Sequence, residues 1–174
     1  ASAFAPHIDR MRLEDAMRAV KIDFTAKFVP LASGDPVSLD KLMTDKKAML
    51  LHFWSPLSRE CETSMPDFIT TAKALGEKGI AVVSLLPEDS PKILTAARDM
   101  LHPLGISPPG TWLVDSKEKP LARDLRVQGL PMFVLVSNDG RILFNGDPTD
   151  DGFWDTLTKI DPQITRPKSQ ESGE

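Results

Sequence analysis

Three side chains in the first half of the sequence are placed so that they could do chemistry together. Ser58 and Cys61 are separated by two residues, and His52 precedes them. A thiol near the start of a helix is favoured as the nucleophilic thiolate, because the free amides and the helix dipole stabilise an anion there. His52 could remove the thiol proton as a general base, although a histidine in an apolar strand is more often a satisfied core residue.

The same residues also permit an unreactive thiol. Cys61 is the single cysteine among 174 residues, so no disulfide can form within one chain. Burial raises the pKa of a thiol, and the neighbouring carboxylates Glu60 and Glu62 would raise it further, whereas Arg59 would lower it. The sequence therefore leaves both a reactive and a silent Cys61 open.

The pattern around these residues predicts a strand, a turn and a helix. The apolar run over residues 48–54 is typical of a strand buried on both faces, and a turn follows at residues 55–57. Ser58 suits the N-cap of the next helix, because its side chain can accept a hydrogen bond from a free amide. Apolar residues then recur at steps of three and four, which predicts one buried helical face. They are Cys61, Met65, Phe68, Ile69, Ala72 and Leu75.

Strands and helices alternate along the rest of the chain, which predicts an α/β fold with a central mixed sheet. Ser90 and Pro91 are typical of a helix start, and Gly105 ends that helix. The turn at residues 137–140 predicts an antiparallel hairpin. The other predicted elements are a small N-terminal hairpin with a short helix over 24–43, strands over 80–86 and 111–114, a short helix over 121–125, and a last helix around Phe153, Leu157 and Ile160.

The stretch Phe53-Trp54-x-x-Leu57-Ser58-x-x-Cys61-x-x-x-Met65-Pro66 resembles the active-site stretch of thioredoxin-fold proteins. The resemblance is strongest to the exported TlpA-like thiol-disulfide oxidoreductases, within the alkyl hydroperoxide reductase and thiol-specific antioxidant superfamily. It implies a three-layer thioredoxin-like fold, in which helices flank a central mixed sheet, with an N-terminal helix and hairpin added.

The chain departs from that family at the position that matters most for its chemistry. Ser58 stands where the family has its first, nucleophilic cysteine, and Leu57 replaces the preceding tryptophan. Cys61 matches the second cysteine, which in the family is mostly covered and resolves the mixed disulfide. Dithiol exchange within one chain is therefore impossible, and whether Ser58 is natural or introduced is not decided by the sequence.

The resemblance also implies a place for a partner. In the family, the proline that matches Pro131 follows a cis peptide bond and lies against the active-site turn. Family members hold extended peptides beside it by backbone hydrogen bonds. The resemblance thus implies a substrate-binding groove formed by Trp54, Leu130 and Pro131.

Two functions follow from these features. The first is a peptide- or protein-binding protein, or a weak monothiol redox protein, with a degenerate Ser58-x-x-Cys61 site. The alternative is a one-cysteine peroxidase, because Ser58-x-x-Cys61 is similar to the Thr-x-x-Cys of peroxiredoxins. Those enzymes also need an arginine near the thiolate, for which Arg123 or Arg126 is the candidate, and they have a proline where this chain has Trp54.

Composition excludes several other classes. The 21 basic and 25 acidic residues are interspersed, so nucleic acid is not a predicted partner. No apolar stretch is long enough to span a membrane. No histidine pair or carboxylate cluster has the spacing of metal ligands, and neither a metal nor another cofactor is predicted. The family resemblance, by contrast, implies a protein or peptide thiol or disulfide as the partner class.

We predict three segments along the chain. Residues 1–21 form a leader and an accessory helix, residues 22–160 form the thioredoxin-like domain, and residues 161–174 are polar, contain proline and form a disordered tail. The small apolar start and the TlpA-like resemblance predict an exported, periplasmic protein, with a cytoplasmic one as the alternative.

Overall fold

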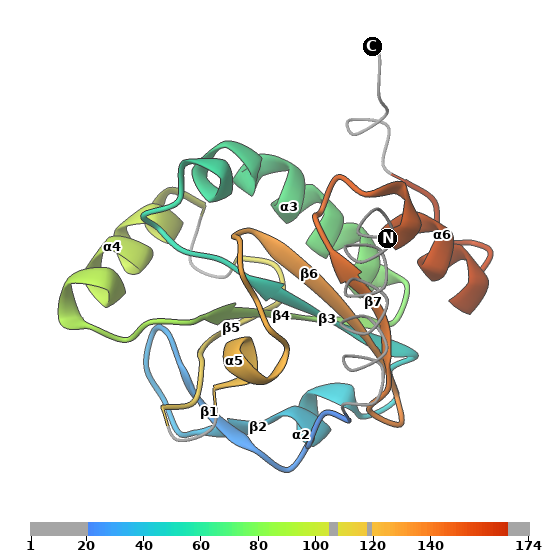
Figure 1. Cartoon of the computed structure of the whole chain (residues 1–174), viewed down its shortest axis with the longest axis horizontal. Coiled ribbons are helices and arrows are strands. Elements are labelled where there is room, and N and C mark those ends of the chain that lie inside the picture. The colour runs from blue at the N-terminus through green and yellow to red at the C-terminus, as the bar shows by residue number, and fades with distance from the viewer. Residues whose placement is uncertain (1–20, 105–107, 118–119, 167–174) are drawn as a thin grey trace, which may run out of the picture.

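The computed structural model describes residues 21–104, 108–117 and 120–166. A seven-stranded mixed sheet lies at its centre, with helices packed on both faces (Figure 1). This arrangement confirms the predicted α/β, three-layer thioredoxin-like fold. The strands follow one another across the sheet in the order β2-β1-β5-β4-β3-β6-β7. Their bounds are β1 Lys27–Pro30, β2 Val37–Ser38, β3 Ala48–Phe53, β4 Ile80–Leu86, β5 Thr111–Val114, β6 Met132–Ser137 and β7 Ile142–Gly146.

The central strands are the apolar runs of the sequence. Every residue of β3 and β4 is buried, as expected for strands covered on both faces. Strand β3 pairs in parallel with β4 and antiparallel with β6, and β6 turns back into β7 as the predicted hairpin. The C-terminal end of β3 therefore lies in the middle of the sheet, where it feeds the helix that carries Cys61.

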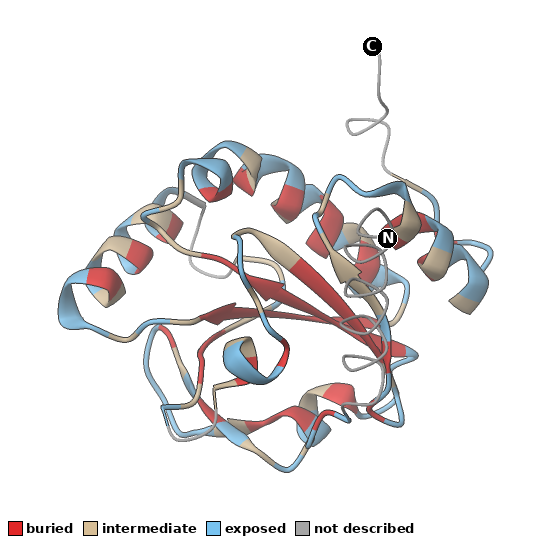
Figure 2. Cartoon of the chain, viewed as in Figure 1, coloured by how far each residue is buried: buried red, intermediate tan, exposed pale blue. Residues whose placement is uncertain are grey.

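Alternate residues of each central strand enter two separate cores, one on each face of the sheet. The central strands are buried along their length (Figure 2). Helices α3 (Arg59–Glu77), α4 (Pro91–Leu101) and α6 (Asp151–Ile160) cover one face. The short helices α2 (Leu39–Met43) and α5 (Leu121–Asp124) cover the other. Cys61 belongs to the core under α3, α4 and α6.

Local signals in the sequence set the helix starts. The side chain of Ser58 caps α3, and the side chain of Ser90 caps α4, with Pro91 in the first turn. Helix α4 was expected to end at Gly105, but it ends at Leu101 and continues as a 3₁₀ turn, η2 (His102–Leu104). Pro103 lies in this turn, where an α-helix would need an amide that proline lacks.

Both predicted terminal segments extend into residues that the structure does not describe. The predicted accessory helix lies at residues 8–20, outside the described residues, and so do residues 167–174 of the predicted tail. The tail was expected to begin at residue 161, but Ile164 is buried and the hydroxyl of Thr158 donates to its carbonyl. Lys47 forms an ion pair with Asp161 and Arg166 forms one with Asp151, so residues 161–166 pack on the domain.

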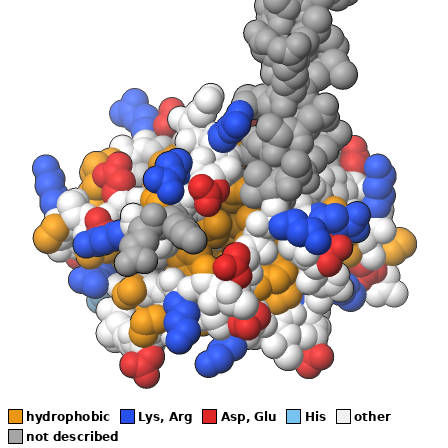
Figure 3. Space-filling model, turned by 60° about the horizontal axis from the view of Figure 1, so that its bottom comes forward, with side chains coloured by type: hydrophobic (Ala, Val, Ile, Leu, Met, Phe, Trp, Pro, Cys, Tyr) orange, Lys and Arg blue, Asp and Glu red, His pale blue; other side chains and the backbone are white. Residues whose placement is uncertain are grey.

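The described surface carries charges of both signs. Figure 3 shows acidic and basic side chains interspersed on one face of the molecule, with hydrophobic side chains between them. Within the described ranges, no helix combines the length and the apolar character that a membrane crossing requires.

Candidate functional site

The turn between β3 and α3 is closed by its own hydrogen bonds. The amide of Ser58 donates to the carbonyl of Ser55, at 3.2 Å, and the amide of Leu57 donates to the hydroxyl of Ser55, at 3.1 Å. The amide of Trp54 still pairs with Leu85 of β4, at 3.3 Å, so the sheet holds the chain until the turn begins. The first turn of α3 is thereby fixed at the end of the central strand.

Ser58 joins the start of α3 to the loop before β6. Its hydroxyl oxygen accepts a hydrogen bond from the amide of Cys61, at 3.2 Å. The same hydroxyl lies 3.2 Å from the carbonyl oxygen of Leu130 and 3.2 Å from Oε2 of Glu60. A hydroxyl has one proton, so it donates to only one of these two acceptors at a time. The peptide bond from Leu130 to Pro131 is cis.

Cys61 is shielded, as the sequence analysis expected of the second position. Its exposed fraction is 1%. Burial raises the pKa of the thiol above its ordinary value, and the charge of Glu60 adds to this, while hydrogen bonds from the side chain of Ser58 and the amide of Ser55 lower it. The amide of Ser55 lies 3.4 Å from Sγ. Burial outweighs the two hydrogen bonds, so the thiol stays protonated at neutral pH.

The contacts of His52 do not support its predicted role as a base. His52 is buried, its Nδ1 lies 2.9 Å from Oγ of Ser84, and its ring stacks on Phe68 with 3.7 Å between the centroids. Burial lowers its pKa to about 3. An imidazole of such low basicity is a poor acceptor for a thiol proton. The geometry instead fits the core-residue reading of the sequence.

The predicted binding residues fall into two groups. Leu130 and Pro131 are half-buried and reach the surface beside Ser58. Trp54 is completely buried and packs edge-on against Trp112, with 5.3 Å between the ring centroids. This burial does not support the predicted contact of Trp54 with a bound peptide, because the apolar run of β3 continues through Trp54 into the core.

Sequence reasoning missed Leu57. Its exposed fraction is 64%, which makes it the most exposed large hydrophobic residue among the described ones. It lies immediately before Ser58, so it presents an apolar side chain to solvent at the edge of the site. Its position in a turn between two buried elements was the signal that could have identified it.

A groove runs along α3 from Pro131 to α6. It consists of two cavities of about 400 Å³ each, which share Ser64, Pro148 and Thr149. We call the two together the α3 groove. The first cavity lies beside Pro131 and the first turns of α3, and the loop between β7 and α6 forms its other wall. No sequence motif marks that loop, because its proximity to α3 arises from the packing of α6.

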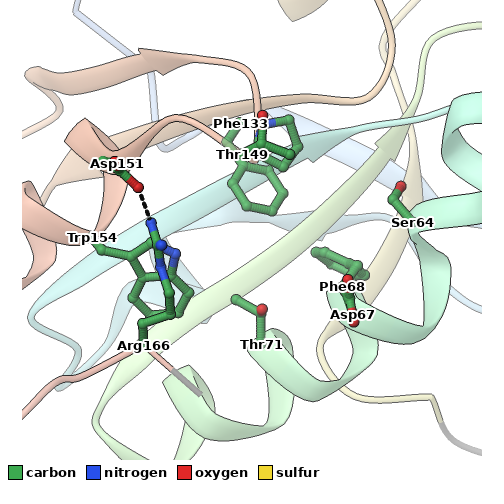
Figure 4. Close-up of a pocket in the computed structure, with 10 residues that line it drawn as sticks. Ser64, Asp67, Phe68, Thr71, Phe133, Thr149, Asp151, Trp154 and Arg166 are labelled. Carbon is green, nitrogen blue, oxygen red and sulfur yellow. Dashed lines mark hydrogen bonds and ion pairs between the residues drawn. The ribbon is translucent and has the colours of Figure 1, made fainter. Parts of the chain in front are cut away.

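Figure 4 shows the second cavity of the α3 groove. Phe68 comes from α3, Phe133 from β6 and Trp154 from α6, so three separate elements supply its aromatic side chains. The ion pair of Arg166 with Asp151, at 2.5 Å, crosses one side of the cavity. Polar side chains of α3 and of the loop before α6 line the rest.

Neither of the two candidate arginines, Arg123 and Arg126, affects the thiol of Cys61 as a peroxidase arginine would. Arg123 belongs to α5, which lies on the sheet face opposite α3, and its ion-pair partner is Asp124, at 3.9 Å. Neither Arg123 nor Arg126 is among the groups that shift the pKa of Cys61. Among the described residues, no group of three or more His, Cys, Asp or Glu side chains could hold a metal ion.

The fold and the position of Cys61 define a thioredoxin-like protein with a single-cysteine site. The model of the AhpC/TSA family matches residues 18–144, and the chain belongs to this family. A search of curated proteins finds no match.

Solved structures with the same fold include thioredoxin-like and thiol-disulfide redox proteins. A putative thioredoxin from Neisseria meningitidis superposes with a TM-score of 0.62 and 23% identity, over 87% of this chain and 98% of that one. A putative thiol:disulfide interchange protein DsbE from Chlorobium tepidum has a TM-score of 0.62 and 21% identity, over 81% and 97%. A secreted Mycobacterium tuberculosis disulfide oxidoreductase homologous to DsbE has a TM-score of 0.58 and 19% identity, over 78% and 96%.

Proposed function

We propose that this protein is a peptide- or protein-binding member of the AhpC/TSA family in which Cys61 is a structural thiol. The observation that carries the proposal is the contrast within one site. Cys61 is 1% exposed and its pKa is raised, whereas the surface beside Pro131 is open as the α3 groove. The site thus keeps a place for a partner while its thiol is withdrawn from solvent.

The surface at Pro131 suits an extended peptide. Leu57 is exposed on the turn before α3, and Leu130 and Pro131 are half-buried on the loop that Ser58 joins to it. Extended segments bind such surfaces by main-chain hydrogen bonds for affinity and by side-chain contacts for selectivity. Leu57 supplies the apolar contact in place of the buried Trp54.

The structural neighbours support a proposal for the compartment and for the class of partner. A structural neighbour is a secreted disulfide oxidoreductase, and others are described as thiol:disulfide interchange proteins. We infer that this chain acts outside the cytoplasm on a protein that carries thiols or disulfides. It would bind that protein without exchanging a disulfide within its own chain, because Cys61 has no second cysteine to pair with.

Thiol titration tests whether Cys61 is unreactive in the folded protein. We expect an aromatic disulfide reagent to label Cys61 only in denaturant, because the sulfur is buried and its pKa is raised. Rapid labelling of the folded protein, with an apparent pKa below about 8, would contradict the proposal.

Affinity capture tests the binding role. The yield of a captured partner should be unchanged by Cys61→Ala and lost with Pro131→Ala, because Pro131 lines the groove and Cys61 does not. Loss of capture with Cys61→Ala but not with Pro131→Ala would assign the interaction to the thiol instead.

The alternative is one-cysteine peroxide reduction by Cys61. The hydrogen bonds from Ser58 and from the amide of Ser55 favour this reading, since both stabilise the thiolate. A thiolate would attack one oxygen of a peroxide, so that the O–O bond breaks and the other oxygen leaves as hydroxide or alkoxide. The sulfenic acid formed must then be reduced by an outside thiol. Mass spectrometry after dilute peroxide distinguishes the two functions, because a gain of one oxygen atom on Cys61 of the folded protein supports the alternative.

A further inference from the structure

A further cavity lies where the end of β1, the end of α4 and the start of β5 meet. Its volume is about 570 Å³, and its lining shares no residue with the α3 groove. Small-molecule sites commonly have volumes of about 300–1,000 Å³ and mostly apolar walls. Leu31, Leu101 and Trp112 supply apolar walls here, one from each of the three elements or the residue that follows it. The size and the lining therefore suit a small organic molecule.

The side chains of this cavity that can carry a charge are those of an arginine and a histidine. Arg98 and His102, at the end of α4 and in the 3₁₀ turn that follows, line it, and no carboxylate does so among the described residues. The molecule as a whole has a net charge of −4. The described lining of this cavity contains an arginine and a histidine but no aspartate or glutamate, so its charge differs in sign from that of the molecule. An anion is the ligand charge that such a lining attracts.

Hydrogen bonds hold the walls of the cavity in place. Nε of Arg98 donates to the carbonyl of Leu31, at 3.0 Å, and the amide of Leu31 donates to the carbonyl of Trp112, at 2.9 Å. The indole of Trp112 donates to the carbonyl of Pro109, at 3.1 Å. The Nε bond orients the guanidinium, and within the described part of the chain its two Nη groups form no hydrogen bond or ion pair. A guanidinium edge has the planar geometry that suits a carboxylate.

Gly110 fixes the path of the chain beside the cavity. Its φ is +88°, and a Cβ at this position would lie 2.9 Å from the carbonyl oxygen of Val82. The glycine therefore lets the chain approach β4 closely just before β5, where Thr111 and Trp112 line the cavity.

We propose that this cavity binds an amphipathic carboxylate of the fatty-acid type. The carboxylate pairs with the Nη groups of Arg98, and the apolar chain packs on Trp112, Leu31 and Leu101. This site is separate from the α3 groove, so the inference goes beyond the proposed function and does not depend on it.

Calorimetric titration with three ten-carbon probes tests the ligand chemistry. Decanoate, below its micelle concentration, should bind with one site per chain and change the tryptophan fluorescence. Decanol should bind at least about tenfold more weakly, because it lacks the charge that Arg98 pairs with. Decyltrimethylammonium should not bind. Absence of decanoate binding, or equal affinity for all three probes, would overturn the proposal.

Variants of the full chain locate the site. Arg98→Gln should weaken decanoate binding at least about tenfold, and Lys92→Gln, an exposed position in the first turn of α4 outside the lining, should leave it unchanged. Ala32→Trp places a large side chain at an exposed lining position and should abolish binding of both decanoate and decanol. Circular dichroism checks that each variant is folded. Decanoate affinity that is the same in Arg98→Gln and Ala32→Trp as in the unmodified protein would show that the cavity is not its site.

Discussion

The hydroxyl of Ser58, which we propose replaces a nucleophilic sulfur, connects the start of α3 to the loop before β6. It accepts from the amide of Cys61 and reaches the carbonyl of Leu130, both at 3.2 Å. A sulfur in this place would lie at the first turn of α3, next to the buried thiol of Cys61. A cysteine at position 58 would therefore test whether a two-cysteine geometry is retained around Cys61.

We expect Ser58→Cys to restore a disulfide within the chain. After mild oxidation the variant should form a bond to Cys61 and lose both free thiols, as counted by a maleimide gel shift. Thr63→Cys is the matched control, because Thr63 is exposed on α3 two positions beyond Cys61 and points to another side of the helix. That control should keep both thiols. Two free thiols in oxidised Ser58→Cys would refute the correspondence of Ser58 with the missing cysteine.

The buried imidazole of His52 makes stability depend on pH. Its pKa falls from an ordinary 6.5 to about 3 in the folded state, so below pH 6.5 the unfolded chain binds a proton that the folded chain does not. The stabilisation is complete above pH 6.5 and is lost as the pH falls toward 3. The free energy of unfolding should drop by about 2 kcal/mol from His52 alone between about pH 7.5 and pH 5.

Urea unfolding at several pH values measures how much His52 contributes to the pH dependence of the free energy of unfolding. His52→Phe retains a ring that can pack on Phe68, and it should lose most of that acid-dependent slope. His102→Gln removes an exposed imidazole and should keep the slope. An equal slope in His52→Phe and the unmodified protein would contradict the assignment to His52.

At the scale of elements, two helices are capped by serine, but the two serines differ in the contacts that they make beyond the cap. Ser90 caps α4 by accepting from the amide of Ile93, at 3.4 Å. Ser58 caps α3 and is also within reach of Leu130 on the loop before β6. A cap alone stabilises by about 1 kcal/mol, and a further hydrogen bond by about as much.

We therefore expect Ser58→Ala to cost more than Ser90→Ala. The free energy of unfolding should fall by about 1 kcal/mol for Ser90→Ala and by about 2 kcal/mol for Ser58→Ala, measured by urea unfolding. Equal losses would show that the contact of Ser58 with Leu130 adds nothing to stability.

The elements that local chemistry specifies were predictable from the sequence. Strand β3 and helix α3 were expected from a continuous apolar run, a capping serine and a helical period, and the structure confirms them. The predicted end of helix α4 lies beyond the observed one, because the apolar period of the sequence continues past Leu101. Pro103 favours a tighter turn instead.

The candidate site was predictable only in part. The shielding of Cys61 was expected from the position it matches, and the structure has it. The burial of Trp54 depends on where β3 ends relative to the edge of the sheet, which no local pattern encodes, whereas the exposure of Leu57 follows from its place in the turn. The loop over residues 147–149 reaches the α3 groove through the packing of α6, a contact between distant parts of the chain.

At the scale of the whole molecule, the sheet separates two cores and the segment after α6 completes one of them. Ile164 is 2% exposed and belongs to the core under α3, α4 and α6. Arg166, two residues later, forms the ion pair with Asp151 at the side of the α3 groove. The packing of residues 161–166 therefore links the stability of this core to the shape of the groove.

Ile164→Ala should reveal that link. Removing a buried isoleucine side chain typically costs about 2–5 kcal/mol, and we expect a loss of unfolding free energy in this range. Ile160→Ala is the matched control, because Ile160 is half-buried at the end of α6, and it should cost less. Hydrogen exchange should also rise at the start of α6 in Ile164→Ala, since Arg166 loses the anchor that holds it against Asp151. A loss no larger than that of Ile160→Ala, measured by urea unfolding, would place residues 161–166 outside the cooperative core.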